Sequence, residues 1–173
     1  MALGLTGVQA SQAQTTQQQT AQVLGHDALA YYGGEIARLQ KQTWHWQRLI
    51  GASLTPPVKR RLAHLSPSAI QQTAADWRHR SAHVQKVAQH PPHLQQFLCI
   101  HHYEGSWTDT GSPYYGGLQM DRSFQQSYGG WLYASKGTAN HWSPLEQIWV
   151  AEKALKSRGY YPWPNTARFC GLL

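Results

Sequence analysis

One stretch, residues 99–120, constrains the fold of this chain more than any other; it reads C-I-H-H-Y-E-G-S-W-T-D-T-G-S-P-Y-Y-G-G-L-Q-M. An apolar helical run stops at Glu104-Gly105, and a polar turn follows it. The run from Tyr114 to Met120 then predicts a short strand. A carboxylate at a helix end, facing a strand rich in Tyr, Gly and Gln, is one way to hold a general acid over a polymer-wide groove. The alternative is an ordinary surface carboxylate, as most Glu residues are.

The length and charge of the chain limit the other possibilities. At 173 residues there is room for one domain plus an extension. The mean hydropathy is −0.54, and no apolar run approaches the roughly 18 residues of a membrane span, so none is expected. The net charge of +7 belongs to the N-terminal half, because residues 1–96 carry nine Lys/Arg and three Asp/Glu whereas residues 97–173 carry six and five.

A basic half can meet nucleic acid or an anionic polymer such as a bacterial cell wall. Apart from Lys59-Arg60-Arg61, the basic residues are scattered along predicted helices. Scattered charges are typical of a solvated face, so we expect no nucleic-acid partner.

Residues 1–30 are expected to be a disordered segment or a truncated leader. The Gln/Thr run from Gln14 to Gln22 is of low complexity and cannot bury a core. Val8-Gln9-Ala10 is similar to a signal-peptidase site, but a charged n-region and a longer apolar region are missing. Either the true start lies further upstream, or the segment is not a signal.

Residues 31–95 are predicted to form a helical hairpin. The apolar residues of 34–50 follow helical spacing, and Gly51 is a suitable stop. A second helix starts with Ser66 as its N-cap and Pro67 at its first position, and it ends before Pro91. Two helices bury little surface alone, so their shared apolar face is expected to pack on the C-terminal domain or on a partner.

The rest of the chain, residues 96–173, reads as helices around one small strand region. Asp121 is expected to cap a short helix that reaches Tyr128. Ser143-Pro144-Leu145-Glu146 is a capping box with proline at the first helical position, and Gly159 ends the helix that it starts. The expected class is therefore α+β, mostly α, preceded by the helical hairpin extension.

Four motifs in this part of the chain occur in a recognisable order. They are E-G-S-W (104–107) with the Y-Y-G-G-L-Q-M run (114–120), Y-G-G (128–130), E-Q-I-W-V-A-E-K (146–153) and G-Y-Y-P-W-P (159–164). Together they resemble the transglycosylase-like domain of the resuscitation-promoting factors of actinobacteria, and four ordered motifs are far more specific than one. The resemblance covers roughly residues 97–173 and implies a small lysozyme-like fold, cleavage of peptidoglycan glycan strands, and Glu104 as the catalytic acid. It also implies export, so a secreted or cell-wall-associated protein is expected and the truncated leader is favoured.

Glycoside cleavage needs an acid that protonates the leaving oxygen. Hydrolases usually add a second carboxylate, whereas a lytic transglycosylase uses one Glu, because the sugar's own 6-hydroxyl attacks and leaves a 1,6-anhydro end. Asp109 and Asp121 are the candidates for a second carboxylate, but Asp109 lies in a turn-like run and Asp121 is better explained as a cap. The predicted reaction is single-Glu cleavage of the β-1,4 bond between N-acetylmuramic acid and N-acetylglucosamine. A lysozyme-type hydrolase and a non-catalytic glycan-binding module remain alternatives.

The substrate-binding candidates lie beside the acid. Trp107, Tyr114 and Tyr115 offer aromatic faces on which sugar rings stack. Gln119 matches the strand Gln of the resembled family, and Ser123 stands where that family has a Thr and keeps the hydroxyl.

The resemblance also implies a disulfide between Cys99 and Cys170. Related domains place one Cys directly before the catalytic Glu and the other just after the Trp-Pro motif, where this chain has Tyr103 and Thr166. Here the first Cys lies four residues earlier and the second four residues later, about one helical turn each. This paired displacement predicts that the bridge is kept and shifted by one turn.

No metal and no cofactor are expected. His79-x-x-x-His83 and His101-His102 lack a convincing third ligand, and the metalloprotease pattern needs a Glu directly after the first His. The expected partners are peptidoglycan glycan strands, with another cell-wall hydrolase as a further candidate, and the chain is expected to be a monomer.

Overall fold

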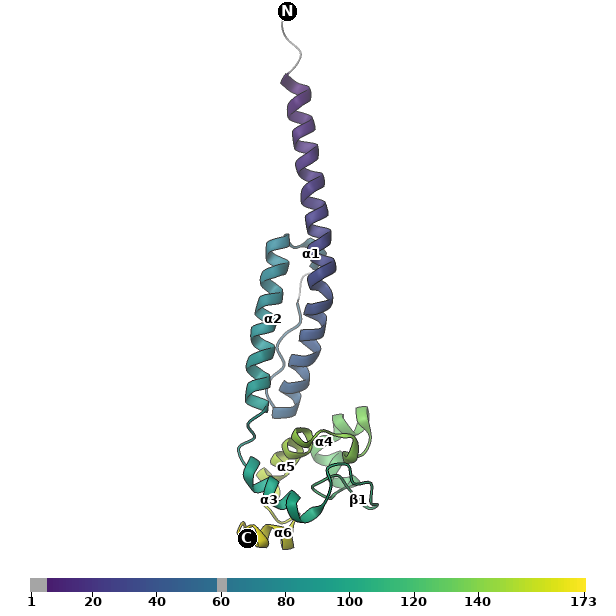
Figure 1. Cartoon of the computed structure of the whole chain (residues 1–173), viewed down its shortest axis with the longest axis vertical. Helices are drawn as coiled ribbons and strands as arrows, with labels where there is room; N and C mark the ends of the chain where they lie inside the picture. The colour runs from purple at the N-terminus through teal and green to yellow at the C-terminus, as the bar shows by residue number, and fades with distance from the viewer. Residues whose placement is uncertain (1–5, 59–61) are drawn as a thin grey trace, which may run out of the picture. The chain divides into compact units, whose positions relative to one another are not determined.

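The computed structural model describes residues 6–58 and 62–173, with side chains from residue 27 onwards (Figure 1). Two parts of the sequence interpretation, the first five residues of the expected leader and the basic run at 59–61, lie outside the described residues. The chain divides into two compact units. One contains residues up to Gln47 together with Ser53–Val84, and the other contains Arg48–Ala52 together with Gln85–Leu173. The domain limits expected from the sequence, 31–95 and 96–173, stay predictions.

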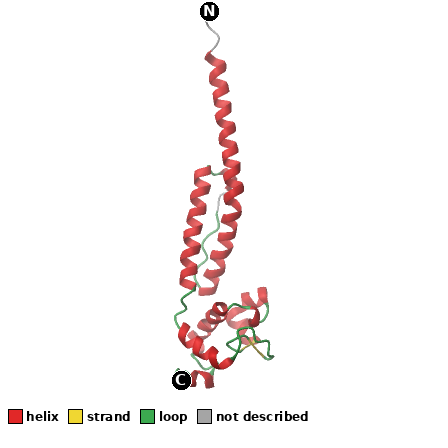
Figure 2. Ribbon diagram, in the orientation of Figure 1, coloured by secondary structure: helices red, strands yellow, loops and turns green. Residues whose placement is uncertain are grey.

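Helices dominate both units, and two short strands form the one sheet within the described residues (Figure 2). The predicted class is therefore confirmed: α+β, mostly α, consistent with a small lysozyme-like domain preceded by a helical hairpin. No helix in the described ranges is both long enough and apolar enough to cross a membrane.

The first unit is built from most of α1 (Thr6–Ile50), a short 3-10 turn η1 (Leu62–His64) and most of α2 (Pro67–Ala88), whose last residues belong to the second unit. The two helices form the predicted hairpin, and apolar side chains from both meet in its core. These buried residues are Ile36, Leu39, Ile70, Ala74 and Trp77.

The start of α1 at Thr6 differs from the expected disordered segment. Its side chains before residue 27 are not described, but the backbone of the Gln/Thr run is helical. Two properties of the sequence account for this. Residues 8–24 contain no Gly or Pro, and Ala and Gln are among the better helix formers.

The second unit contains the strand pair and four complete helices. They are α3 (Leu94–Glu104), α4 (Arg122–Lys136), α5 (Pro144–Arg158) and α6 (Pro164–Phe169), with a 3-10 turn η2 (Ala139–His141) between α4 and α5. Phe97 and Ile100 from α3, Leu132 from α4 and Ile148 from α5 are almost completely buried at its centre.

The predicted strand from Tyr114 to Met120 is wrong in its topology. The chain forms two strands, β1 (Tyr114–Tyr115) and β2 (Met120–Asp121), which pair antiparallel with Tyr114 opposite Asp121. The intervening turn is closed by a hydrogen bond from Gln119 N to Gly116 O of 3.1 Å. Gly116 has a φ of +73°, which only glycine adopts readily, so the Gly-Gly pair turns the chain back.

The helix starts predicted from the sequence are confirmed. Asp121 accepts the Phe124 amide as the N-cap of α4, and Ser143 and Glu146 form both halves of the capping box of α5. Gly159 lies at the C-cap of α5. Helix α4 runs beyond the expected Tyr128 to Lys136, across a non-helical residue at Gly129.

The predicted Cys99–Cys170 disulfide is present in the structure and joins α3 to the end of α6, with 6.0 Å between the two Cα atoms. It spans 71 residues. A loop of that length contributes about 4 kcal/mol to stability in the loop-entropy description. The bridge therefore closes most of the second unit covalently.

Candidate active site

Glu104 is the last residue of α3, and its side chain is half-buried. The helix stops there because the next residue, Gly105, has a φ of +138°, a conformation that residues with a side chain rarely adopt. Oε1 of Glu104 accepts a hydrogen bond of 2.7 Å from Oγ1 of Thr166 in α6. The end of α3 and the start of α6 are thus joined at the predicted acid.

The carboxylates of residues 97–173 fall into two groups. Four of the five accept a hydrogen bond from a backbone amide and so hold local structure. The pairs are Asp109 with Gly111, Asp121 with Phe124, Glu146 with Ser143, and Glu152 with His93. Within this described range, Glu104 is the one carboxylate whose hydrogen bond comes from a side chain alone.

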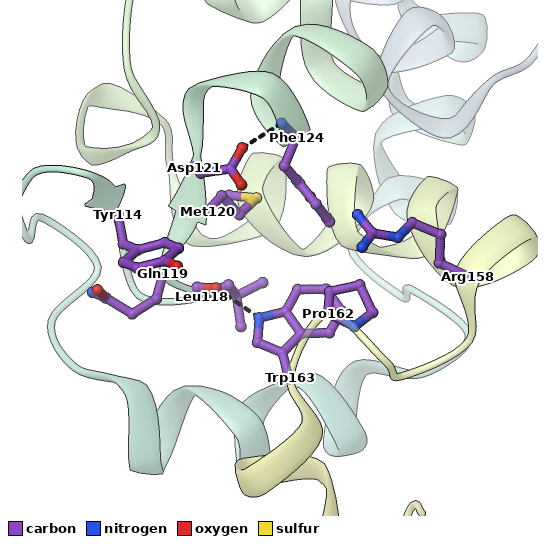
Figure 3. A pocket seen from close by; sticks show the side chains of 9 residues that line it. All are labelled: Tyr114, Leu118, Gln119, Met120, Asp121, Phe124, Arg158, Pro162 and Trp163. Carbon is purple, nitrogen blue, oxygen red and sulfur yellow. Dashed lines mark hydrogen bonds between the residues drawn. The ribbon is translucent and has the colours of Figure 1, made fainter.

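An open hollow lies beside the strand pair (Figure 3). It is lined by Tyr114, Leu118, Gln119, Met120, Asp121, Phe124, Arg158, Pro162 and Trp163. Its volume is about 130 Å³, well below the roughly 300–1,000 Å³ of pockets that enclose a small ligand. A shallow cradle of this kind fits one part of an extended chain better than a whole small molecule.

Glu104 is not one of the lining residues, but its neighbours in the chain and in space lie near them. A methyl group added at the neighbouring Gly105 would lie 3.7 Å from Nε2 of Gln119. Thr166, the hydrogen-bond partner of Glu104, follows Trp163 by three residues in the first turn of α6. The backbone after Glu104 thus approaches Gln119, and its side chain is bonded to the turn that follows Trp163.

Gln119 is held in an unusual conformation. Its φ is +45°, which is uncommon for a residue with a side chain and often marks a functional site. Its Nε2 donates to Asp109 Oδ2 at 2.7 Å and to Gly116 O at 3.0 Å. Both donors of the amide are thereby directed to the protein, which leaves Oε1 to accept a hydrogen bond from a ligand.

Two of the predicted substrate-binding aromatics point into the fold. Trp107 is half-buried and stacks on His101, with ring centroids 3.8 Å apart. Tyr115 is only 7% exposed, and Arg122 donates to its hydroxyl at 3.1 Å. Hydrogen bonds from Ser112 and Arg122 lower the pKa of the Tyr115 phenol. Of the predicted aromatics, Tyr114 is the one that lines the hollow, and it is 50% exposed.

Ser123 lies in a neighbouring hollow rather than in the first. It is exposed, and its Oγ donates to Asp121 Oδ1 at 2.8 Å. Bonds from the Phe124 amide and the Ser123 hydroxyl lower the pKa of Asp121. Because Asp121 lines both hollows, the two adjoin at this residue.

Several residues that line the hollow were not predicted as site residues, among them Arg158, Leu118 and Trp163. Trp163 is 3% exposed and donates to Leu118 O at 2.7 Å. Their positions depend on how α5 and α6 pack against the strand pair. No local pattern in the sequence reports that packing.

Gln147 of α5 is a polar residue that holds both the loop before β1 and the turn between the two strands. It is completely buried. Its Oε1 accepts from Gly117 N at 2.9 Å, and its Nε2 donates to Trp107 O at 2.8 Å. Helix α5 also buries Glu146 and Glu152, so the sequence offered no signal that singled out Gln147.

The residues that the structure describes contain no group of three His, Cys, Asp or Glu side chains arranged to bind a metal ion. Of the histidines beside the acid, His101 makes a 3.0 Å hydrogen bond between its Nδ1 and Gly117 O. This bond and the stacking on Trp107 give His101 a positioning function in the loop.

The small, mostly helical domain, closed by a disulfide, is consistent with a lysozyme-like fold. Residues 103–166 match the family model of the transglycosylase-like domain, so the resemblance predicted from the four motifs is confirmed.

Two curated relatives match a part of the chain of similar length. Resuscitation-promoting factor RpfE of Mycobacterium tuberculosis is 40% identical over 65 residues, which are 37% of this chain and 35% of the relative. A resuscitation-promoting factor of Corynebacterium glutamicum is 38% identical over 69 residues, which are 39% of this chain and 35% of the relative. The matches thus span about a third of each relative. No solved structure gave a significant match.

Proposed function

We propose that this protein cleaves peptidoglycan glycan strands at the β-1,4 bond between N-acetylmuramic acid and N-acetylglucosamine, with Glu104 as the sole catalytic carboxylate. The family match and the names of the relatives support a transglycosylase-like domain. The observation that carries the proposal is the division of the carboxylates. Four of them are bound to backbone amides, and Glu104, at the end of α3, is bound only by a hydroxyl.

In the proposed reaction, protonated Glu104 gives its proton to the oxygen that leaves as the 4-hydroxyl of N-acetylglucosamine. The bond from this oxygen to C1 of N-acetylmuramic acid breaks, and the 6-hydroxyl of that sugar bonds to C1. Glu104 then takes the proton of the 6-hydroxyl, so it ends the cycle protonated. No water enters the products, and the new end is a 1,6-anhydro sugar. The residues of this chain complete the cycle without a cofactor.

The surrounding residues suit a glycan. Tyr114, exposed at the rim, offers a ring face for stacking. Gln119 Oε1 is positioned to accept from an N-acetyl N–H or a sugar hydroxyl, because both amide hydrogens are used by the protein. Ser123 and the second hollow extend the surface beyond Asp121. Trp107 and Tyr115 support the site through contacts within the fold: Trp107 stacks on His101, and the Tyr115 hydroxyl accepts a hydrogen bond from Arg122.

A substrate of this kind places the protein outside the cell membrane, secreted or associated with the cell wall. We propose that it acts as a monomer, with peptidoglycan as its partner and another cell-wall hydrolase as a candidate second partner. The basic N-terminal half suits contact with an anionic wall polymer.

Incubation with purified peptidoglycan, followed by mass spectrometry of the soluble products, tests the proposal. The wild type is expected to release 1,6-anhydro-muropeptides, and Glu104→Gln, which keeps the size but cannot donate the proton, is expected to release none. Asp76→Asn is the matched control, since this carboxylate is exposed on α2 in the other compact unit, and it should retain the same products.

Other outcomes identify the alternatives. Products with a reducing end, lost in Glu104→Gln, would indicate a hydrolase, and loss of activity in Asp109→Asn or Asp121→Asn would then point to its second carboxylate. No products, with wild type and Glu104→Gln both still pelleting with the cell wall, would indicate a glycan-binding module.

A further inference from the structure

We infer that Thr166 is a positioning residue for Glu104: its hydroxyl holds Oε1 of the carboxyl and leaves Oε2 to carry the proton to the substrate. The inference rests on the proposed function. Its structural basis is the 2.7 Å hydrogen bond between Thr166 Oγ1 and Glu104 Oε1.

The environment of Thr166 makes this contact well defined. The residue is 8% exposed and lies in the first turn of α6, so water competes little for its hydroxyl. The hydroxyl has one hydrogen to donate. Its other acceptor, Trp163 O, lies at 3.5 Å, which is long for an O–H bond. The hydrogen is therefore directed to Glu104.

The disulfide between α3 and the end of α6 is a second contact that fixes this geometry. Cys99 is bonded to Cys170, and Glu104 is paired with Thr166, so a later residue of α3 meets an earlier residue of α6. The two helices thus run antiparallel with two cross-links, one covalent and one a hydrogen bond. The disulfide holds the register in which the hydroxyl reaches the acid.

The chemistry follows from the two forms of the carboxyl group. In the protonated form, one oxygen is a carbonyl and the other bears the hydrogen. Because Thr166 donates to Oε1, this oxygen is the carbonyl and Oε2 bears the proton. When the proton moves to the glycosidic oxygen, Oε1 gains negative charge, and a hydrogen bond to a charged oxygen is stronger than one to a neutral oxygen. The Thr166 hydroxyl therefore stabilises the transition state more than the ground state.

The test compares variants that differ only in the hydroxyl. Thr166→Val keeps the shape and removes the donor, whereas Thr166→Ser keeps the donor. Initial rates of release from peptidoglycan at saturating substrate are expected to fall roughly 10- to 100-fold in Thr166→Val, as for the loss of one charge-assisted hydrogen bond. Thr166→Ser should retain most of the wild-type rate. The amount of protein that pellets with the cell wall should be equal in all three, because the contact is to the acid and not to the glycan.

A second pair covers the case in which valine disturbs the packing of α6. Thr166→Ala and Thr166→Ser differ by the hydroxyl alone in a smaller side chain, and Ser should again be the faster. Equal rates for Ser and Ala, or for wild type and Val, with the wild type active, would overturn the inference. A wild type that releases nothing would instead overturn the proposed function, so the two failures are distinguishable.

Discussion

The buried amide of Gln147 should contribute several kilocalories per mole to the free energy of unfolding of the second unit. Its four hydrogen bonds reach Gly117 N at 2.9 Å and the carbonyl oxygens of Trp107, Ala139 and Trp142 at 2.8, 3.0 and 3.1 Å. Gln147→Met keeps the approximate length and volume, so it leaves little cavity. Methionine cannot form these hydrogen bonds, so the Gly117 amide and the Trp107 carbonyl lose the partner that Gln147 provides.

The expected cost follows from those two groups. A buried polar group left unpaired costs about 1–3 kcal/mol, so two such groups should lower the free energy of unfolding by roughly 2–6 kcal/mol. The loop that carries Trp107 and the turn that carries Gly117 should also loosen, because the amide links both to α5. Hydrolysis or transglycosylation of peptidoglycan should then decrease, although no atom of Gln147 reaches the substrate.

Urea unfolding followed by tryptophan fluorescence measures the first effect, and hydrogen exchange at the Gly117 amide measures the second. The transition of the unit with residues 85–173 is the one to compare, because the chain has two compact units. Gln126→Met on the exposed face of α4 is the matched control, and it should change the free energy by less than about 0.5 kcal/mol. If Gln147→Met is equally mild and Gly117 keeps its protection, the reasoning from unpaired buried groups is refuted.

Two further predictions concern the strand pair and the helix that follows it. Asp121→Ala should destabilise the unit by about 1 kcal/mol at pH 7 through loss of the N-cap. Because the folded-state pKa of Asp121 lies below its usual 3.8, this difference should be complete above about pH 4 and shrink as the pH falls through the folded value; a difference independent of pH in urea titrations would contradict it. Gly117→Ala should cost about 1–3 kcal/mol, since the new methyl would lie 2.5 Å from Nδ1 of His101. Gly130→Ala, with open space around it, should be neutral or slightly stabilising by thermal unfolding, and equal melting temperatures for the two variants would refute the argument.

The helix boundaries were predictable because they depend on short-range chemistry. A Ser143 hydroxyl three residues before Glu146, or an Asp121 carboxylate at a helix start, acts on amides within one turn of itself. The Gly116-Gly117 pair was visible too, but a strand and a tight hairpin share the same composition, and only the pairing partner distinguishes them. At the N-terminus, low complexity favoured disorder while Ala and Gln propensity favoured the helix that the structure contains.

The candidate site was predictable only in part, for a related reason. Glu104 and Gln119 could be named because motif order marks them. Trp107 and Tyr115 looked as well suited to stack on a sugar as Tyr114 did. Their orientation, however, is set by contacts with His101 and Arg122, which lie elsewhere in the sequence. The bond from Thr166 to Glu104 joins residues 62 apart in the sequence. No local pattern encodes such a contact.

The covalent bridge also determines what a single break in the chain would do. Residues 110–113 are exposed ahead of β1, and exposed loops are where proteases cut first. A cut there would separate the sequence into one piece that ends soon after Glu104 and another that contains α4, α5 and α6. Cys99 and Cys170 lie on opposite sides of the break, so both pieces would stay tethered beside one another. The nicked protein would migrate as one species until it was reduced, and its acid would still be held next to Thr166.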